Sequence, residues 1–212
     1  MNEAAKDGNS AERLNRLLIQ AGQEPLSAPK LVQFADYLSL IIRWNARTNL
    51  TAVRDEEGIL SMHFVESIAV AHVLPAGIAT LLDFGSGAGF PGIPIALCRP
   101  EIAVTLAESR GKKAAFLQEV VRTLKLTAKV HAGRAEELPE VFDCVAFRAV
   151  DRMEEAVAAA VPLVGAGGWL ALMTTQADLP RLQPKAGAGF NWLAPVPLPG
   201  SDRRILSLGR NG

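Results

Sequence analysis

The first third of the chain carries apolar residues at the spacing of amphipathic helices. In the first apolar stretch, leucines and alanine recur at i, i+3, i+4 and i+7, and Gly22 follows as a helix stop. Stretches with this helical period lie at residues 11–21, 29–45 and 55–73. They predict a helical N-terminal extension over residues 11–76, preceded by a polar tail, residues 1–10, that we expect to be disordered.

After Gly77 the pattern changes to short apolar strands that alternate with helical segments. Strands are predicted at residues 80–84, 103–107, 128–132, 142–147 and 169–174, with helices at 92–98, 111–124, 134–138 and 152–160. Two further strands, near 190–194 and 204–208, have no helix between them and should pair as a hairpin. Because helices separate the first five strands, we expect an α/β fold over residues 77–212 with a doubly wound, mostly parallel, seven-stranded sheet.

One uncharged stretch is long enough to raise the question of a membrane span. Ala156 to Met173 contains 18 residues without a charge. Pro162 and the run Gly165-Ala166-Gly167-Gly168 interrupt this stretch, which is typical of a helix, a turn and a strand beginning near Trp169. We therefore expect no membrane partner for this segment.

The most informative motif is the segment from Leu81 to Gly92, which reads LLDFGSGAGFPG. An apolar strand runs there directly into four glycines, and an apolar helix follows. Because no side chains fill such a loop, its backbone N–H groups point at whatever lies on it. The motif predicts a cradle for a nucleotide-type cofactor, and a glycine turn that binds nothing is the structural alternative.

Two classes of cofactor fit this loop. From Gly87 the letters match the dinucleotide pattern G-x-G-x-x-G, and from Asp83 they match D-x-G-x-G-x-G of S-adenosylmethionine (SAM) methyltransferases. Asp83 suits the methionyl ammonium and would repel a pyrophosphate, while Pro91 removes one N–H from the helix start. The chain also has little room for the substrate domain of a dehydrogenase. SAM is therefore favoured over NAD. Glu108, 21 residues after Gly87, suits the ribose hydroxyls of either cofactor.

Composition narrows the class of protein further. The 212 residues are 49% hydrophobic and 21% charged, as in a globular protein with room for one good-sized α/β domain. Cys98 and Cys144 form no C-x-x-C pair, and the three histidines show no metal-ligand spacing. We expect neither a disulfide scaffold nor a metal site.

Charge is balanced overall but uneven along the chain. Lys and Arg outnumber Asp and Glu by six to three in residues 99–125 and by five to one in residues 181–212. Cations also follow three predicted strands, at Lys112-Lys113, Arg134 and Arg148, on the edge where parallel sheets bind ligands. We expect ligand or phosphate contacts at this edge, and solvated surface charges are the plain alternative.

Several polar residues in the N-terminal part are interpreted as structural residues that satisfy hydrogen bonds. Asn45, Asn49 and Thr51 follow a predicted helix and can satisfy its free carbonyl and N–H groups. His63 lies within a helical run, and we expect it to be a hydrogen-bonded structural histidine rather than a metal ligand.

Two strings are far more specific than the glycine loop alone. They are WNARTNLTAVRD at residues 44–55 and GSGAGFPGIP at residues 85–94. Shorter matching strings lie at 63–67, 108–109, 112–113, 116–117, 134–137, 142–143 and 148–149. With these strings the chain resembles the bacterial small-subunit ribosomal RNA methyltransferase G family, also called the glucose-inhibited division protein B family, over nearly its full length.

The resemblance implies a Rossmann-like, class I SAM-dependent methyltransferase of the cytoplasm. Its reaction would be methyl transfer from SAM to N7 of one guanine in the decoding region of 16S rRNA. The expected partner is 16S rRNA or a 30S subunit precursor, and we expect a monomer without a metal. Guanine N7 attacks through a free lone pair, so the site must supply alignment and needs no general base.

The resemblance also implies which residues form the site. The implied cofactor site consists of Gly85, Phe90, Ala135, Glu136 and Arg148, with Asp83, Gly87 and Glu108 nearby. Glu136 would accept from the adenine amino group, and Arg148 is the residue expected beside both cofactor and guanine. The residues expected to bind RNA are Arg54, Lys112, Lys113, Arg203 and Arg204.

The chain departs from the family pattern at two positions. Met173-Thr174 stands at the end of the fifth predicted strand where the family often has Lys-Gly, and Glu66 stands where the family often has Asp. The missing lysine keeps open a second function, a SAM-binding protein of the same fold with a different or lost methyl acceptor. A small oxidoreductase is the alternative from another enzyme class, disfavoured by Asp83 and Pro91.

Overall fold

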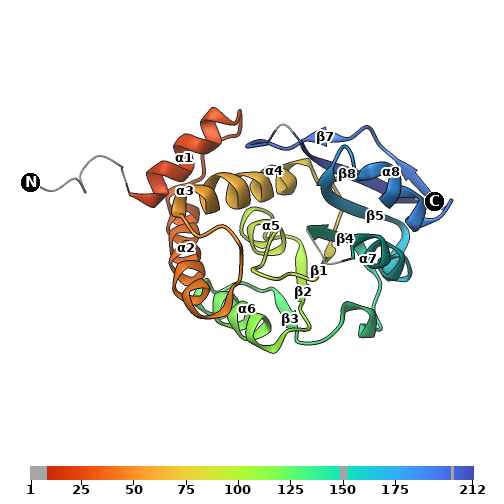
Figure 1. Cartoon of the computed structure of the whole chain (residues 1–212), viewed down its shortest axis with the longest axis horizontal. Coiled ribbons are helices and arrows are strands. Elements are labelled where there is room, and N and C mark those ends of the chain that lie inside the picture. Colours follow the sequence, from red (N-terminus) through yellow and green to blue (C-terminus); the bar gives the residue numbers. More distant parts are fainter. Residues whose placement is uncertain (1–8, 149–151, 202) are drawn as a thin grey trace, which may run out of the picture.

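A single sheet lies at the centre of the computed structural model, which describes residues 9–148, 152–201 and 203–212 (Figure 1). Its strand order is β3-β2-β1-β4-β5-β8-β6, and β7 pairs with β8. Strands β1 to β5 are parallel, and β8 runs antiparallel to its neighbours, so the expected mostly parallel α/β sheet is confirmed. The strands are β1 (Thr80–Phe84), β2 (Ala103–Ala107), β3 (Lys129–His131), β4 (Phe142–Arg148), β5 (Val164–Thr175), β6 (Phe190–Trp192), β7 (Val196–Pro197) and β8 (Arg204–Asn211).

Two strands differ from the expectation. The sheet has eight strands in the described ranges rather than seven, because β7 is a two-residue edge strand, too short to leave a periodic pattern. β5 begins at Val164 instead of near Trp169, since its glycines continue as an irregular strand with a register shift against β4. The expected antiparallel pairing of the last two predicted strands is found between β6 and β8.

Helices flank the sheet and form the N-terminal extension. They are α1 (Ser10–Gln20), α2 (Ala28–Thr48), α3 (Glu56–Ile59), α4 (Glu66–Val73), α5 (Gly92–Cys98), α6 (Gly111–Thr123), α7 (Met153–Ala160) and α8 (Leu179–Leu182). A π-helical turn, η2 (Leu60–Val65), joins α3 to α4 inside the helix expected over 55–73. Short 3₁₀ turns are η3 (Ala135–Glu137), η4 (Val161–Leu163) and η5 (Gln183–Ala186). Asn9 caps α1, and residues 1–8 of the expected disordered tail lie outside the described residues.

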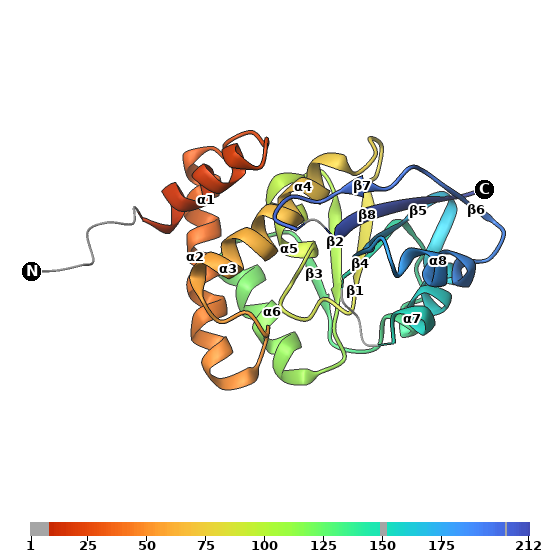
Figure 2. The ribbon, with the colours of Figure 1, turned by 45° about the horizontal axis from the view of Figure 1, so that its top comes forward.

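Successive residues of the central strands point to opposite layers, as the two-residue period of a strand requires. Leu81 and Cys144 belong to a cluster with the extension, α5 and α6, whereas Leu82 and Val145 belong to a cluster with α7 and α8. Figure 2 shows the extension and α7 with α8 on opposite sides of the sheet. Burial on both faces explains why the strands appear in the sequence as continuous apolar runs.

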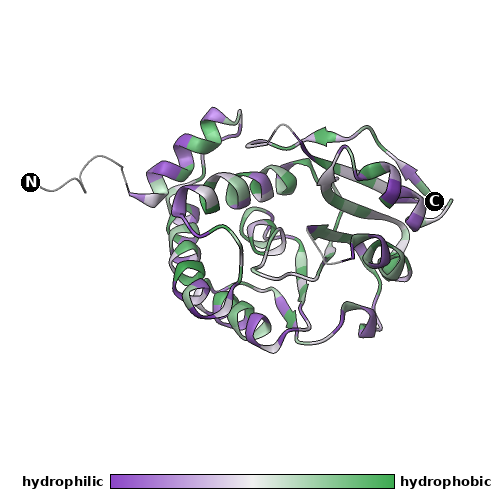
Figure 3. Ribbon diagram, viewed as in Figure 1, coloured by the Kyte–Doolittle hydropathy of each residue, from purple (hydrophilic) through white to green (hydrophobic). Residues whose placement is uncertain are grey.

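The extension packs directly onto the sheet layer. Tyr37 of α2 stacks on Phe64 of η2 with ring centroids 5.2 Å apart, and its ring lies 5.5 Å from that of Phe90, which follows β1. Figure 3 shows hydrophobic residues along the central strands and alternating hydrophobic and hydrophilic residues along α1 and α2. Extension and sheet therefore share one hydrophobic core.

The uncharged stretch from Ala156 to Met173 runs through α7, η4 and the irregular start of β5. Within the described ranges, no helix combines the length and the apolar character that a bilayer crossing needs. Val164 and Trp169, on either side of the glycine run, pair with Phe142 and Cys144 of β4, so the stretch belongs to the globular fold.

Candidate active site

The glycine loop connects β1 to α5 at the carboxyl edge of the sheet. Gly85, Gly87 and Gly89 have φ values of +73°, +56° and +91°, which residues with a Cβ rarely adopt. The hydroxyl of Ser86 donates to the carbonyl oxygen of Asp83 at 2.9 Å and tightens the turn. Gly85 is exposed, so the backbone of the loop is open to a ligand there.

Asp83 lies beneath this loop and is fully buried. Its Oδ2 accepts the N–H of Gly92 at 3.1 Å, and a Cβ on Gly92 would come within 2.5 Å of that oxygen. Burial raises the pKa of the Asp83 carboxyl to about 7. The carboxyl group, expected near the methionyl ammonium, thus holds the start of α5 against the end of β1.

Glu108, at the end of β2, also holds backbone. Its Oε2 accepts from the N–H of Gly87 at 2.9 Å, and its Oε1 accepts from the N–H of Arg110 at 2.7 Å. Only 6% of the residue is exposed. The carboxylate expected to meet ribose hydroxyls therefore joins the glycine loop to the start of α6.

A cavity of about 420 Å³ opens beside the loop at the carboxyl ends of β1 and β2. It is lined by Phe84, Gly85, Ala107, Ser109, Gly133, Arg134, Ala135, Glu136, Arg152, Glu155, Ala156 and Ala159. Three of the expected cofactor residues, Gly85, Ala135 and Glu136, line this cavity together. We call it the loop cavity.

A larger cavity of about 710 Å³ lies next to the loop cavity and shares Arg152 and Glu155 with it. It is lined by Arg152, Met153, Glu154, Glu155, Ala158, Met173, Thr174, Thr175, Asp178, Arg181, Leu182, Lys185 and Arg204. We call it the β5 cavity, because the end of β5 forms its floor. Sequence reasoning missed it, although Met173-Thr174 at the strand end was the signal that could have located it.

Arg148, at the end of β4, turns toward the extension. Its Nη2 donates to the carbonyl oxygen of Met62 at 2.8 Å and to Nδ1 of His63 at 2.7 Å, and it lies 3.1 Å from Oε2 of Glu66. The guanidinium is 5.7 Å from the centroid of the Phe90 ring. Burial lowers the pKa of Arg148 to about 10, so the group stays charged at neutral pH. Arg148 and Phe90 contact each other but do not line either cavity within the described residues.

Glu66 lies between two arginines. Its Oε1 is 3.1 Å from Nε of Arg204, so one fully buried carboxylate faces the cations of both β4 and β8. Burial raises the pKa of Glu66 against the opposing effect of the two arginines. Arg204, expected to bind RNA, is thus engaged in an ion pair at the edge of the β5 cavity.

Tyr37 is a site residue that sequence reasoning missed. Its hydroxyl donates to the carbonyl oxygen of Ala88 in the glycine loop at 2.5 Å, and the residue is fully buried. A Cβ on Gly89 would come within 2.7 Å of the same hydroxyl oxygen. Tyr37 sits among the apolar residues of the second predicted helix, so nothing in the sequence pattern distinguishes it from a core residue.

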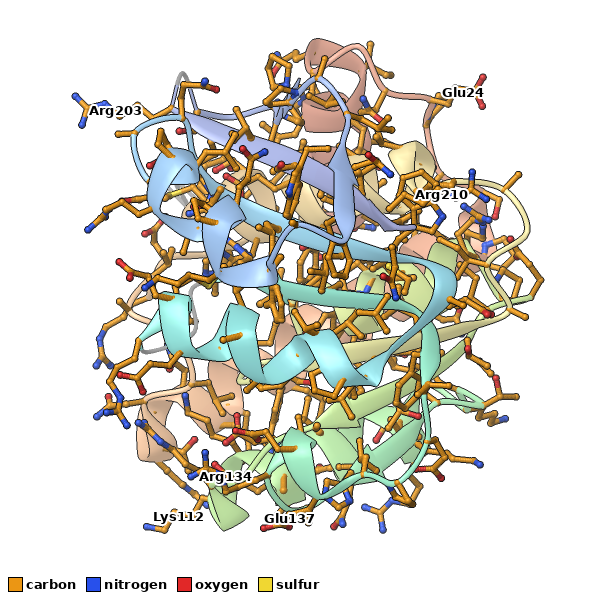
Figure 4. The ribbon with its side chains drawn as sticks, turned by 90° about the vertical axis from the view of Figure 1, so that its right-hand side faces the viewer. Glu24, Lys112, Arg134, Glu137, Arg203 and Arg210 are labelled. Carbon is orange, nitrogen blue, oxygen red and sulfur yellow. The ribbon has the colours of Figure 1, made fainter. Side chains whose placement is uncertain are left out.

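The other cations expected to bind RNA are spread over the molecule. Arg54, Lys112 and Arg203 are exposed, and Nζ of Lys113 would lie 4.0 Å from a Cβ on Gly87. Figure 4 shows Lys112 beside Arg134 at one end of the molecule and Arg203 at the other. Arg134 forms an exposed ion pair with Glu136 at 2.8 Å on the rim of the loop cavity. In the described part of the chain, no cluster of His, Cys, Asp and Glu could hold a metal ion.

The family model and the curated relatives that this chain matches carry the same name. Residues 30–185 match the family model described as rRNA small subunit methyltransferase G. Ribosomal RNA small subunit methyltransferase G of Xanthomonas euvesicatoria is 41% identical over 177 residues, covering 82% of this chain and 81% of that protein. The Desulfitobacterium hafniense protein of the same name is 40% identical over 176 residues, covering 79% and 72%.

Solved structures show the same fold at low sequence identity. An O-methyltransferase from Bacillus cereus in complex with SAH has a TM-score of 0.58 and 17% identity, covering 84% of this chain and 91% of that chain. A predicted O-methyltransferase from Agrobacterium tumefaciens also has a TM-score of 0.58, with 20% identity, covering 69% and 81%. The fold is the Rossmann-like fold of SAM-dependent methyltransferases.

Proposed function

This chain belongs to the rRNA small subunit methyltransferase G family, and we propose that it methylates N7 of one guanine in the decoding region of 16S rRNA. In this reaction SAM supplies the methyl group. The N7 lone pair forms the new N–C bond while the C–S bond breaks and its electron pair stays on sulfur, leaving S-adenosylhomocysteine and a cationic 7-methylguanine. No proton moves before attack, so the protein's task is alignment.

The loop cavity is the proposed cofactor site. Gly85 lines the cavity with backbone atoms alone, and its positive φ is one that glycine adopts readily. Ala135 leaves room for a flat ring beside the carboxylate of Glu136, which can accept from an adenine amino group. The volume of about 420 Å³ lies within the range of roughly 300–1,000 Å³ typical of small-molecule sites.

The observation that carries the proposal is the adjacency of two cavities at the carboxyl edge of the sheet. An enzyme that modifies a base must take the base out of its stack into a pocket. The β5 cavity shares Arg152 and Glu155 with the loop cavity, and its volume of about 710 Å³ suits a nucleotide. A guanine in the β5 cavity would lie beside a cofactor in the loop cavity.

Arg148 is the proposed positioning group at this junction. β4 lies between β1 and β5, whose ends line the loop cavity and the β5 cavity respectively. The end of β4 therefore lies between the two cavities, and from there Arg148 turns its guanidinium toward the extension, over the ring of Phe90. We expect Arg148→Ala to reduce methyl transfer by about a hundredfold, because a ~1 Å misplacement of reacting groups costs that much.

The proposed partner is the 16S rRNA, alone or in a 30S precursor, and the proposed location is the cytoplasm. Support comes from the exposed cations Arg54, Lys112 and Arg203 and from Lys113 beside the glycine loop. A monomer that needs no metal is part of the proposal, since alignment of N7 requires neither a second subunit nor a Lewis acid.

The function is tested by methyl transfer to 30S subunits that come from a bacterial strain without a methyltransferase of this family. The purified protein and labelled SAM should yield 7-methylguanine at one position of 16S rRNA, mapped by mass spectrometry of RNase fragments. Gly85→Asp is the matched inactive control, because its side chain would occupy the loop cavity. Absence of 7-methylguanine with the unaltered protein would reject the proposal.

A second function is favoured by one observation, the floor of the β5 cavity. Met173 and Thr174 offer no cation there, and the cavity's own cations are paired with carboxylates, as in Lys185 with Glu154 at 3.1 Å. The protein would then bind SAM and act on another acceptor or on none. Calorimetric SAM binding without transfer to 30S subunits would favour this second function.

A further inference from the structure

His63 lies between two segments that meet at the proposed active site. It belongs to η2, a π-helical turn. The carbonyl oxygen of the preceding residue, Met62, and the ring of His63 both face Arg148. One ring nitrogen, Nδ1, is 2.7 Å from Nη2 of Arg148, and the other, Nε2, is 2.8 Å from Oγ1 of Thr51. The ring packs against Phe90 of the glycine loop at a centroid distance of 4.8 Å.

The guanidinium determines the tautomer of this histidine. An arginine can only donate, so Nδ1 must accept, and the proton of a neutral imidazole must lie on Nε2. The Nε2–H then donates to Thr51 Oγ1. Burial, with Arg148 as a second cause, lowers the pKa of His63 to about 4, so the ring remains neutral at physiological pH.

Thr51 belongs to a loop that carries one of the cations expected to bind RNA. We call residues 49–55 the arginine loop, after Arg54, whose Nη2 donates to Oδ1 of Asn49 at 2.8 Å. Asn45 Oδ1 accepts the N–H of Thr51 at 3.1 Å and so fixes the loop on the end of α2. The loop contacts Arg148 through His63.

We infer that His63 is a positioning residue, which holds the Arg148 guanidinium over Phe90 and joins it to the arginine loop. The inference rests on the proposed function, because Arg148 acts on methyl transfer only if the site methylates. His63 itself lines neither cavity within the described residues. Its effect should therefore appear in kcat and not in the affinity for SAM.

Two substitutions separate the two hydrogen bonds. In His63→Asn the amide oxygen stands near the place of Nδ1 and can still accept from Arg148. In His63→Gln the terminal amide stands near the place of Nε2, so it keeps the contact with Thr51 and loses the acceptor for Arg148. We expect His63→Asn to retain most of kcat and His63→Gln to lose roughly tenfold to a hundredfold. The Kd of SAM, measured by calorimetry, should change less than about twofold in both.

Matched controls exclude a general effect of removing a histidine. His72 of α4 bonds Gln23 at the surface at 3.0 Å, so His72→Asn and His72→Gln should keep the unaltered kcat. In the background of Arg148→Ala, His63→Gln should cause no further loss, since the residue through which it acts is gone.

Each other outcome overturns the inference. Equal losses in His63→Asn and His63→Gln would make His63 a packing residue, and a further loss in the Arg148→Ala background would show that it acts by another route. If His63→Gln does not fold, Thr51→Val replaces it: loss of the acceptor for His63 Nε2–H should lower kcat, and should cause no further loss in the Arg148→Ala background. Failure of the proposed function is distinguishable, because then the unaltered protein transfers no methyl group at all.

Discussion

At the scale of single residues, the conformation of the glycine loop depends on the lack of a Cβ atom at its glycines. Gly85 combines a φ of +73° with an open position in the wall of the loop cavity. Gly92 has no such φ, but a Cβ there would meet Leu106 at 2.4 Å and Asp83 at 2.5 Å. The two glycines therefore differ in what they leave free: Gly92 makes room for internal packing, and Gly85 is the glycine that we propose the cofactor approaches.

Gly85→Asp should abolish SAM binding, because it adds a side chain and a negative charge where the cofactor approaches the backbone. Isothermal calorimetry measures the loss. Gly22→Asp is the matched control, since Gly22 has nearly the same φ, +70°, and no atom within 4 Å of its Cβ position. Loss of SAM binding in both variants would mean that backbone strain, rather than obstruction, is responsible.

Asp83 makes stability depend on pH. Its pKa is about 7 in the folded protein against an ordinary value of 3.8, so between these values the folded state holds a proton that the unfolded state has lost. Stability then falls as pH rises from about 4 to 7. At about 1.4 kcal/mol per unit, the contribution reaches about 4 kcal/mol as an upper bound.

Asp83→Asn should remove this dependence. The measurement is urea unfolding of both proteins from pH 4 to pH 8. The difference between their unfolding free energies should change steadily from pH 4 to about 7, as the stability of the unaltered protein falls, and level off above pH 7. The opposite titration of His63, which costs stability below its ordinary pKa, is common to both proteins and cancels in the difference. Parallel curves across this range would contradict the assignment of a buried, proton-holding carboxyl.

At the scale of elements, α2 and η2 of the extension both contact the glycine loop. Tyr37 donates to Ala88 from α2, and His63 packs on Phe90 from η2. The extension thus supports the loop directly, in addition to sharing its core.

Tyr37→Phe tests whether the extension shapes the cofactor site. It removes one buried hydroxyl from the carbonyl of Ala88 and leaves the ring, so about 1 kcal/mol of loop support is lost. We expect the Kd of SAM to rise roughly fivefold, with Tm lowered by only a few degrees. A Tm loss with an unchanged Kd would limit Tyr37 to a role in stability.

At the scale of the whole molecule, the cations expected to bind RNA do not form one patch. Lys112 and Arg203 lie at opposite ends of the view in Figure 4, and Arg204 is paired with Glu66. The proposed RNA interface is therefore centred on the start of α6, beside the glycine loop, and on the arginine loop, which Thr51 joins to His63.

Lys112→Ala should weaken RNA binding and leave SAM affinity nearly unchanged, because Lys112 does not line the loop cavity. The slope of log K against log salt should fall by about one, as for loss of one phosphate contact. Filter binding of 16S rRNA at several salt concentrations measures the slope, and Lys129→Ala on β3 is the exposed control. A loss of SAM binding in Lys112→Ala would assign this lysine to the cofactor site.

The sequence alone determined the order of elements and the place of the loop. Short apolar runs that alternate with helical segments predicted β1, β2, α5 and α6 within a residue or two, because those elements are buried against the core and must be apolar there. The glycine loop was visible for the same kind of reason, since no other residue type readily tolerates its backbone. The two-residue β7 and the irregular start of β5 were not visible, because pairing partners far along the chain impose them.

Tertiary structure alone decided where the polar side chains of the site point. Asp83, Glu108 and Arg148 were located correctly at strand ends, yet each turns inward, onto backbone or onto the extension. A strand fixes which residue lies at its end, but the direction of a long side chain follows from which partners satisfy its charge. Those partners, Gly92, Gly87 and His63, lie between 9 and 85 residues away in sequence, so no local pattern could identify them.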